Sequence, residues 1–265
     1  PKTSIICSPM TSLKTSIKTI TYLSDTGCLE IQGASLTGIS ALIIVAAIYG
    51  YSVGKYEIFP YSVMYDLKKK ISPSDGKIKR NPIYENKSSL YDTFTSKNDI
   101  VMFGDSYMEY GNWGDIFNME ISNRGIAGDD TLGMLARIDQ AWKPNPKKVF
   151  IMAGINDIDK NIPSSVTIKN INDIALMLNQ RGIEVYVNSV VYSGESQKKR
   201  NKYVTEINTK LEELRLSKHS GFTYINLNDV LAPSGVMLKS YSSDDTHLNS
   251  EGYKVWRDKL EPYMH

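Results

Sequence analysis

The sequence has 265 residues, of which 41% are hydrophobic and 23% charged, an ordinary balance for a globular protein. A formal net charge of +2 gives no field strong enough to attract a polyanion, and no basic stretch is interleaved with aromatic residues. We therefore exclude nucleic acid as a partner. The length allows one large domain or a smaller domain with an additional segment, and the composition favours the second arrangement.

The first part of the chain is predicted to anchor the protein in a membrane. No charged residue occurs between Glu30 and Lys55, and the apolar interval 31–54 is long enough to cross a bilayer once as a helix. Tyr49 falls where aromatic residues border a membrane. A buried helix of a soluble domain is the alternative interpretation. We expect an N-terminal tail over residues 1–30 and a single transmembrane helix over residues 31–54.

The segment that follows the anchor is predicted to be a linker. Residues 55–97 are rich in Lys, Ser, Pro and Asn and contain turn-forming pairs such as Asn81-Pro82. Lysines flank the apolar interval on both sides and slightly favour a cytoplasmic C-terminal side. Both cysteines, Cys7 and Cys28, precede the interval, so cysteine usage does not indicate the redox compartment of the rest of the chain.

The remainder, residues 98–265, alternates between short apolar strands and longer helical patterns. The predicted strands are 100–103, 119–122, 148–153, 183–191 and 222–227. The predicted helices are 113–117, 132–141, 164–181, 197–216 and 250–260. This alternation predicts an α/β domain in which helices cover both faces of a five-stranded parallel sheet.

Four polar loops follow strands of the predicted sheet. They are Gly104-Asp105-Ser106, the glycine-containing loop 125–128, Gly154-Ile155-Asn156, and the segment 242–247 after the last strand. In a parallel sheet the carboxyl ends of all strands share one edge, so loops that are dispersed in the sequence meet there. We therefore expect these four loops to form one site.

The residues in these loops fit the requirements of acyl transfer. A serine hydroxyl needs a base to take its proton, and the base needs a third group to orient it. We assign Ser106 as nucleophile, His247 as base and Asp244 as the orienting carboxylate. The developing oxyanion needs donors, which the backbone N–H groups of Ser106 and Gly128 and the side-chain amide of Asn156 can supply.

Each of these features also has an ordinary structural interpretation. An Asp-x-x-His pair can simply stabilise a loop, Gly128 can be a turn glycine, and Asn156 can cap a helix. A metal site built from Asp244, Asp245 and His247 lacks further ligands at suitable spacing. We therefore predict neither a metal nor another cofactor.

Taken together, the four loops resemble the conserved blocks of the SGNH, or GDSL-type, hydrolase family. The matching segments are Gly104-Asp105-Ser106, residues 123–129, Gly154-x-Asn156-Asp157 and Asp244-x-x-His247. The sequence over 123–157 is similar to the branch that contains platelet-activating-factor acetylhydrolase subunits and bacterial carbohydrate O-acetylesterases. This resemblance implies a flavodoxin-like, three-layer α/β/α sandwich and hydrolysis of small acyl esters without a metal. The first block departs from the family pattern at Tyr107, where a leucine is typical.

The expected function is a serine esterase that removes a short acyl group, most simply acetyl, from an envelope carbohydrate. Tyr107 and Trp113 are the predicted substrate-binding residues because they lie close to the first block in the sequence. Alternatives are a lysophospholipase or thioesterase acting beside the membrane, a glycan O-acyltransferase, and a non-catalytic binding module. The expected partners are an acylated carbohydrate or small ester and the membrane. Envelope carbohydrates are processed outside the inner membrane, so we expect the catalytic part on the periplasmic side, against the weak preference of the lysines.

Overall fold

The computed structural model describes residues 19–22, 29–32, 46–47, 49, 82–216 and 221–265. The chain divides into two compact units, Pro1–Pro73 and Ser74–His265. In the first unit, strands β1 (Thr19–Tyr22) and β2 (Leu29–Gln32) pair in antiparallel fashion. Most of the anchor predicted over 31–54 lies outside the described residues, and within the described part no helix has both the length and the apolar character needed to cross a membrane.

The second unit contains the five-stranded parallel sheet that the sequence predicted. Its strands are β3 (Ile100–Gly104), β4 (Ile121–Gly125), β5 (Lys148–Met152), β6 (Glu184–Asn188) and β7 (Thr223–Ile225). Their order across the sheet is β4-β3-β5-β6-β7, the order of a flavodoxin-like sheet. In the pairing register Gly104 lies beside Gly125 on one side and Met152 on the other. The loops that follow these three strands therefore start at the same level of the sheet edge.

Burial on both faces explains why the strands were recognisable from sequence. All five residues of β3 are buried, and β5 is buried from its second residue onward. A strand covered on both faces is a continuous apolar run, not an alternating one. The rings of Phe150 and Tyr186, on neighbouring strands, stack with their centroids 4.7 Å apart. This central sheet is a rigid base for the loops at its edge.

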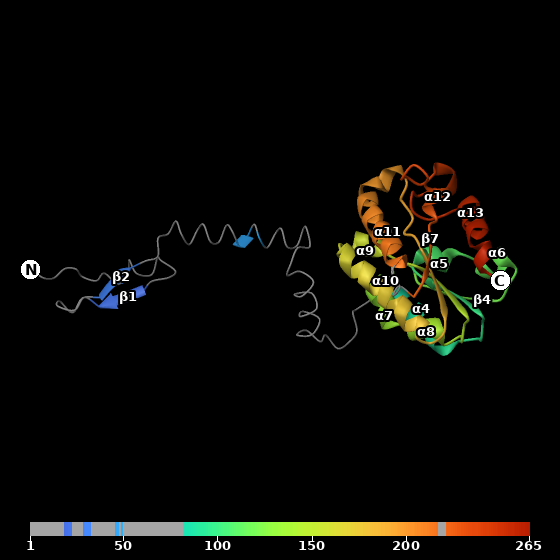
Figure 1. Ribbon diagram of the computed structural model, residues 1–265, viewed down its shortest axis with the longest axis horizontal. Helices are drawn as coiled ribbons and strands as arrows, with labels where there is room; N and C mark the ends of the chain where they lie inside the picture. Colours follow the sequence, from blue (N-terminus) through green and yellow to red (C-terminus); the bar gives the residue numbers. More distant parts are fainter. Residues whose placement is uncertain (1–18, 23–28, 33–45, 48, 50–81, 217–220) are drawn as a thin grey trace, which may run out of the picture. The chain divides into compact units, whose positions relative to one another are not determined.

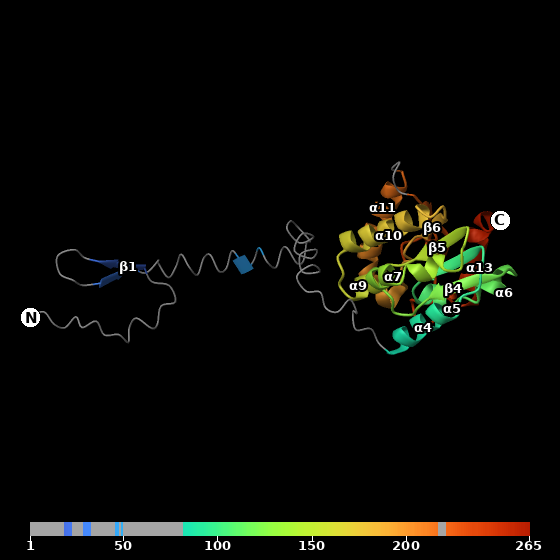
Figure 2. The same cartoon turned by 90° about the horizontal axis from the view of Figure 1, so that it is seen from below.

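Helices form a layer on each face of the sheet (Figures 1 and 2). On one face α10 (Ser164–Asn179) packs against α7 (Thr131–Ala136) and α11 (Asn201–Arg215). On the other face α6 (Trp113–Phe117) packs against α13 (Ser250–Leu260), where the rings of Trp113 and Trp256 meet edge to face at 4.9 Å. The shorter helices are α5 (Ser106–Tyr110), α8 (Asp139–Trp142), α9 (Ile155–Asp159), α12 (Asn228–Leu231) and the 3-10 turns η1 (Glu195–Arg200), η2 (Lys239–Tyr241) and η3 (Glu261–Tyr263).

A further helix, α4 (Pro82–Thr93), lies within the segment 55–97 that was expected to be a linker. It belongs to the second unit, and its side chains bind the rest of that unit directly. The Tyr84 hydroxyl donates to the Gly133 carbonyl at 3.3 Å, and the Tyr91 hydroxyl donates to the Gly125 carbonyl at 2.7 Å. The part of this segment that forms α4 is therefore packed structure.

One predicted helix is divided in two. The pattern over residues 132–141 suggested a single helix, but the chain leaves helical geometry at Arg137, with φ −118° and ψ 24°, between α7 and α8. The guanidinium of Arg137 turns into the core, where it binds the Asp129 carboxylate at 2.8 Å and the carbonyls of Arg124 and Gly104. These contacts compete with helix continuation and explain the break.

Candidate active site

Ser106 lies at the point where β3 becomes α5. Asp105 caps this helix, since its side chain accepts a hydrogen bond from the Tyr107 N–H at 3.0 Å. Ser106 is the first helical residue and is 5% exposed. A Cβ on Gly104 would lie 2.2 Å from the Met152 carbonyl oxygen, so only glycine fits where β3 ends against β5. This close packing fixes the position of Ser106.

The structure brings Ser106, His247 and Asp244 into one hydrogen-bonded chain. His247 Nε2 lies 3.0 Å from Ser106 Oγ, and His247 Nδ1 lies 2.7 Å from Asp244 Oδ2. The serine and the histidine are 141 residues apart in sequence. This geometry permits proton transfer from the hydroxyl to the imidazole while the carboxylate orients the ring.

Asp244 is held as an ionised acceptor. Its Oδ1 accepts the backbone N–H groups of Thr246 at 2.9 Å and His247 at 2.7 Å, and the Ser242 hydroxyl at 3.1 Å. Although partial burial opposes the effect, the hydrogen bonds from the His247 side chain and from both N–H groups hold the pKa of Asp244 far below its usual range. Backbone N–H groups of the tight Asp-x-x-His turn thus bind one carboxylate oxygen of Asp244, and the other oxygen orients the imidazole.

Residues 242–247, which we call the base loop, are fastened to the turn η1. Asp245 adopts a positive φ of 62°, its carbonyl accepts the Gly194 N–H at 2.8 Å, and its carboxylate accepts the Ser196 N–H at 2.9 Å. A Cβ on Gly194 would collide with the Asp245 side chain. The carboxylate that a metal site would have required is therefore engaged with η1.

Two further side chains, those of Tyr107 and Arg200, also hold the base loop. The Tyr107 hydroxyl donates to the Thr246 carbonyl at 2.5 Å, and Arg200 Nη2 donates to the Thr246 hydroxyl at 2.5 Å. Arg200 also binds both carboxylate oxygens of Asp159, at 2.8 and 3.0 Å, at the end of α9. Its Nε donates to the Ser193 hydroxyl at 2.6 Å. No local sequence signal marks the role of Arg200 at the base loop, because Asp159 and Thr246 are 41 and 46 residues away.

The predicted oxyanion donors lie on the loops after β3, β4 and β5. The Ser106 N–H is at the first position of α5, where no intrahelical acceptor is available. Gly128 is exposed with φ +76°, and Lys160 donates to its carbonyl at 2.7 Å. The Asn156 amide donates one hydrogen to the Asp129 carbonyl at 2.9 Å. Because an amide group carries two N–H donors, the second remains for a ligand.

A buried acid lies directly beneath the nucleophile. Burial, reinforced by the nearby carboxylates of Asp129 and Asp157, raises the pKa of Asp105 to about 8, while the hydrogen bond from the Tyr107 N–H opposes the rise. Its Oδ2 atom has no hydrogen-bond partner in the described part of the chain. Asp105 is thus a neutral acid at pH 7 that caps α5.

A second buried acid joins two of the site loops. Asp157, on α9, accepts the Thr131 N–H at 3.1 Å and also the Thr131 hydroxyl. Burial raises the pKa of Asp157, and the Thr131 hydrogen bonds oppose that rise. The start of α7 is therefore tied to the loop that carries Asn156.

Tyr107 and Trp113, the predicted substrate-binding residues, are core residues in this structure. Each is 1% exposed, the Tyr107 hydroxyl binds Thr246, and the Trp113 indole N–H donates to the Met108 carbonyl at 2.8 Å. Closeness in sequence did not reveal which way these rings point. The exposed aromatic ring at the site is that of Tyr110, whose centroid is 5.1 Å from the His247 imidazole.

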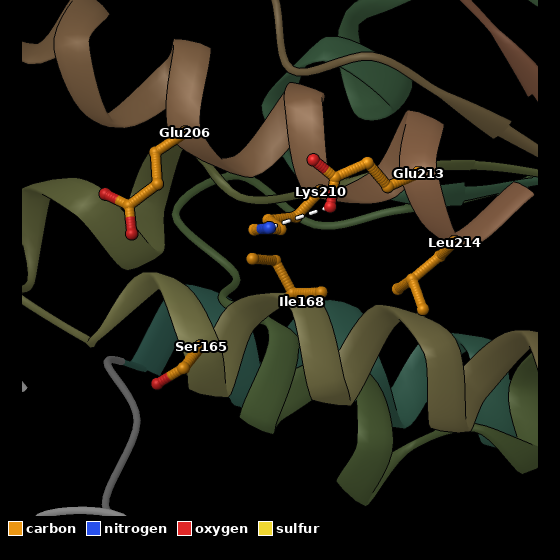
Figure 3. A pocket seen from close by; sticks show the side chains of 6 residues that line it. All are labelled: Ser165, Ile168, Glu206, Lys210, Glu213 and Leu214. Atoms are coloured by element: carbon orange, nitrogen blue, oxygen red, sulfur yellow. Dashed lines mark hydrogen bonds and ion pairs between the residues drawn. The ribbon is translucent and has the colours of Figure 1, made fainter. Parts of the chain in front are cut away.

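A cavity of about 540 Å³ lies elsewhere, between α10 and α11 (Figure 3). It is lined by Ser165, Ile168, Glu206, Lys210, Glu213 and Leu214, and Lys210 pairs with Glu213 across 2.7 Å. None of the hydrogen-bonded residues around Ser106 lines it, so this cavity is separate from the candidate site.

Solved structures with the same fold come from several bacteria. A structure from Streptococcus pneumonia, described as a platelet activating factor, has a TM-score of 0.61 at 23% identity and covers 69% of this chain and 91% of its own. A GDSL-like lipase from Bacteroides thetaiotaomicron has a TM-score of 0.60 at 20% identity, covering 68% and 96%. An acetyl xylan esterase has a TM-score of 0.51 at 18% identity, covering 63% and 99%.

One curated protein shares a short segment. The uncharacterized protein YuaK of Escherichia coli (strain K12) is 95% identical over 38 residues, a match that spans 14% of this chain and 40% of that protein.

A family model confirms the family membership that the four sequence blocks indicated. The model of the GDSL-like Lipase/Acylhydrolase family matches residues 102–255, which is more than half of the chain and includes Ser106, Asn156 and His247. The chain belongs to the GDSL-like lipase/acylhydrolase (SGNH) family of ester hydrolases.

Proposed function

We propose that this ester hydrolase removes short acyl groups, with acetyl as the favoured one, from a carbohydrate. The observation that carries the proposal is the hydrogen-bonded chain of Ser106, His247 and Asp244, with distances of 3.0 and 2.7 Å. It supplies a nucleophile, a base and an orienting carboxylate in one place.

In the proposed reaction, Ser106 Oγ attacks the ester carbonyl carbon while His247 Nε2 accepts the hydroxyl proton. Asp244 stabilises the resulting imidazolium and keeps its Nδ1–H directed toward the carboxylate. His247 then gives the proton to the departing alcohol oxygen, which leaves an acyl group on Ser106. A water molecule, deprotonated by His247, attacks this acyl group and releases the carboxylic acid and free serine.

Negative charge develops on the carbonyl oxygen during both attacks. We assign its stabilisation to the backbone N–H groups of Ser106 and Gly128 and to the uncommitted N–H of the Asn156 amide. Donors on a packed framework need no reorganisation when charge appears, which makes such groups effective. Asp157 and Lys160 support this role, because they hold the loops that carry Gly128 and Asn156.

The carbohydrate substrate is supported by the sequence over 123–157, which is similar to carbohydrate O-acetylesterases, and by the acetyl xylan esterase that shares the fold. We further propose that the protein is membrane-anchored through residues 31–54 with its catalytic unit outside the cytoplasm, where envelope carbohydrates are processed. Protease treatment of intact spheroplasts tests this location. Protection of the catalytic unit would contradict it.

The mechanism is tested with an aryl acetate and the variants Ser106→Ala and His247→Ala. We expect kcat to fall by more than about 10³-fold in each, since members of such a unit act together. The matched controls are Ser89→Ala on α4 and His265→Ala at the chain end, which should retain activity. Turnover near the wild-type rate in both site variants would exclude the mechanism.

The acyl group is tested with aryl esters of increasing chain length. We expect acetate to be released fastest, whereas faster release of long chains would favour a lysophospholipase or thioesterase. Product analysis with a sugar acceptor distinguishes hydrolysis from transfer, because a transferase would yield a newly acylated sugar instead of free acid.

A further inference from the structure

Tyr110 lies one helical turn after Ser106. Both residues belong to α5, and residues four apart on a helix share a face. The Tyr110 ring centroid is 5.1 Å from that of the His247 imidazole, with the two planes tilted by 55°. The nucleophile, the base and this phenol ring therefore border the same region of the protein.

Exposure distinguishes Tyr110 from the other aromatic residues nearby. It is 55% exposed, whereas Tyr107 and Trp113 are each 1% exposed. Its hydroxyl has no hydrogen-bond partner among the residues that the structure describes. A large ring with an apolar face and a polar edge is well suited to binding an amphipathic ligand.

Side-chain hydrogen bonds hold the backbone on both sides of Tyr110. The Asn123 side-chain amide donates to the carbonyls of Met108, Glu109 and Gly111, at 2.8, 3.2 and 3.1 Å. The Glu109 carboxylate accepts the Ala127 N–H at 2.5 Å and pairs with Lys87 at 3.1 Å. The ring is thus presented from a rigid turn, which lowers the entropic cost of binding a ligand.

We propose that Tyr110 is a platform on which a sugar ring of the acylated carbohydrate stacks while its ester group reaches Ser106. A pyranose ring presents a face of C–H groups with hydroxyls around its edge, and this pattern matches the face and edge of tyrosine. The inference rests on the proposed function and deepens it, because it assigns recognition of the alcohol part of the ester to a specific residue.

Steady-state kinetics with two acetyl esters tests the platform. One substrate is an O-acetylated xylo-oligosaccharide and the other is triacetin, which has no ring to stack. For Tyr110→Leu we expect kcat/KM to fall about 10-fold further on the oligosaccharide than on triacetin, mainly through KM. Tyr110→Phe keeps the aromatic face and should recover most of the loss. Tyr203→Leu, at another exposed tyrosine on α11, is the matched control.

The outcomes separate this inference from the proposed function. Equal losses on both esters would mean that Tyr110 only covers the His247 imidazole, and the platform would be rejected while the esterase activity stands. If Tyr110→Leu left kcat/KM unchanged on both esters, the platform would be rejected as well. If the wild-type protein hydrolyses triacetin but no acetylated carbohydrate, the proposed substrate class and the platform both fail. Circular dichroism of each variant verifies folding.

Discussion

The acidic residues around Ser106 differ in the protonation state that their surroundings favour. Asp244 accepts several hydrogen bonds and stays ionised, which suits a residue that must orient an imidazole and balance its charge. Asp105 is fully buried, with a pKa of about 8. Two aspartates near one serine therefore have different roles, because one is surrounded by donors and the other is desolvated.

The state of Asp105 predicts how stability changes with pH. The unfolded chain releases this proton near pH ~4, whereas the folded protein keeps it up to about pH 8. Stability from this group is complete below about pH 4 and decreases as pH rises toward 8, by at most about 1.4 kcal/mol per pH unit. Asp105→Asn should reduce this decrease, which urea unfolding between pH 5 and 8 measures. An unchanged slope, equal to that of the surface control Asp258→Asn, would disprove it.

As the proposed side-chain oxyanion donor, Asn156 is expected to affect the rate of the chemical step more than substrate binding. Replacement by Ala removes both the proposed oxyanion donor and the 2.9 Å bond to the Asp129 carbonyl. We expect kcat for an aryl acetate to fall about 10²- to 10³-fold with little change in KM, because the donor acts on charge that appears in the transition state. A large rise in KM with kcat preserved would instead indicate ground-state binding.

At the scale of elements, the base loop is held from outside as well as by its own turn. It is bonded to η1 through Asp245, to α5 through Tyr107, and to α9 through Arg200 and Asp159. Arg200 is 12% exposed, so solvent screens its interactions less than those of surface ion pairs. The placement of His247 thus depends on three neighbouring elements.

Arg200 is therefore expected to be a positioning residue. We predict that Arg200→Met lowers kcat about 10-fold while KM changes little, because the base is displaced but the substrate-binding surface is not. Arg200→Lys should recover only part of the rate, since an ammonium cannot bind the Asp159 carboxylate and Thr246 with the same planar geometry. Stopped-time assays of acetate release measure both kcat and KM.

The control for this experiment is Arg257→Met, which removes a partly exposed arginine whose side chain is paired only with Asp258 in the described structure. A double-mutant cycle with Asp159→Asn then measures the coupling of the pair. Additive effects of Arg200→Met and Asp159→Asn would contradict the proposed link between α9 and the base loop.

The sheet and the central hydrogen-bonded residues could be predicted because their signals are local or follow from topology. β3 and β5 are apolar runs, and parallel strands bring Ser106, Asn156 and Asp244 to one edge. The short helices α5 and α9 were not predicted, because the polar segments in which they begin, Gly104-Asp105-Ser106 and Gly154-Ile155-Asn156, were assigned to loops.

Other features depend on partners that are distant in the chain. The sequence around Arg200 does not indicate that its side chain binds Thr246. Arg137 ends α7 through contacts with the carbonyls of β3 and β4. The burial of Tyr107 depends on which face of α5 packs inward, which one short segment does not indicate. In all three cases, contacts with residues distant in the sequence determine where the side chain lies.

At the scale of the whole molecule, α4 shows that the catalytic unit begins earlier than residue 98. Besides the bonds of Tyr84 and Tyr91, the Gln140 amide donates to the Ser88 hydroxyl at 2.9 Å and to Asp92 at 3.1 Å. Tyr91 reaches the Gly125 carbonyl, which ends β4 just before the loop with Gly128. Helix α4 therefore supports the edge strand beside the site.

A comparison of two truncated chains tests this contribution. Residues 74–265 should fold and hydrolyse aryl acetate, whereas residues 98–265 should lose several degrees of Tm or aggregate, because the surface that α4 covers becomes exposed. Differential scanning calorimetry measures the difference. Equal Tm values for the two chains would show that α4 is dispensable. Tyr91→Phe in the longer chain isolates one hydrogen bond, with an expected loss of about 1 kcal/mol.

The separation of 141 residues between Ser106 and His247 has a consequence for biosynthesis. The ribosome makes the nucleophile before the base, so a nascent chain that already contains Ser106 but not His247 has no partner for its serine. With the proposed mechanism, ester cleavage requires that the base loop has emerged and packed against η1. Translation that stops before His247 would accordingly leave fragments without esterase activity.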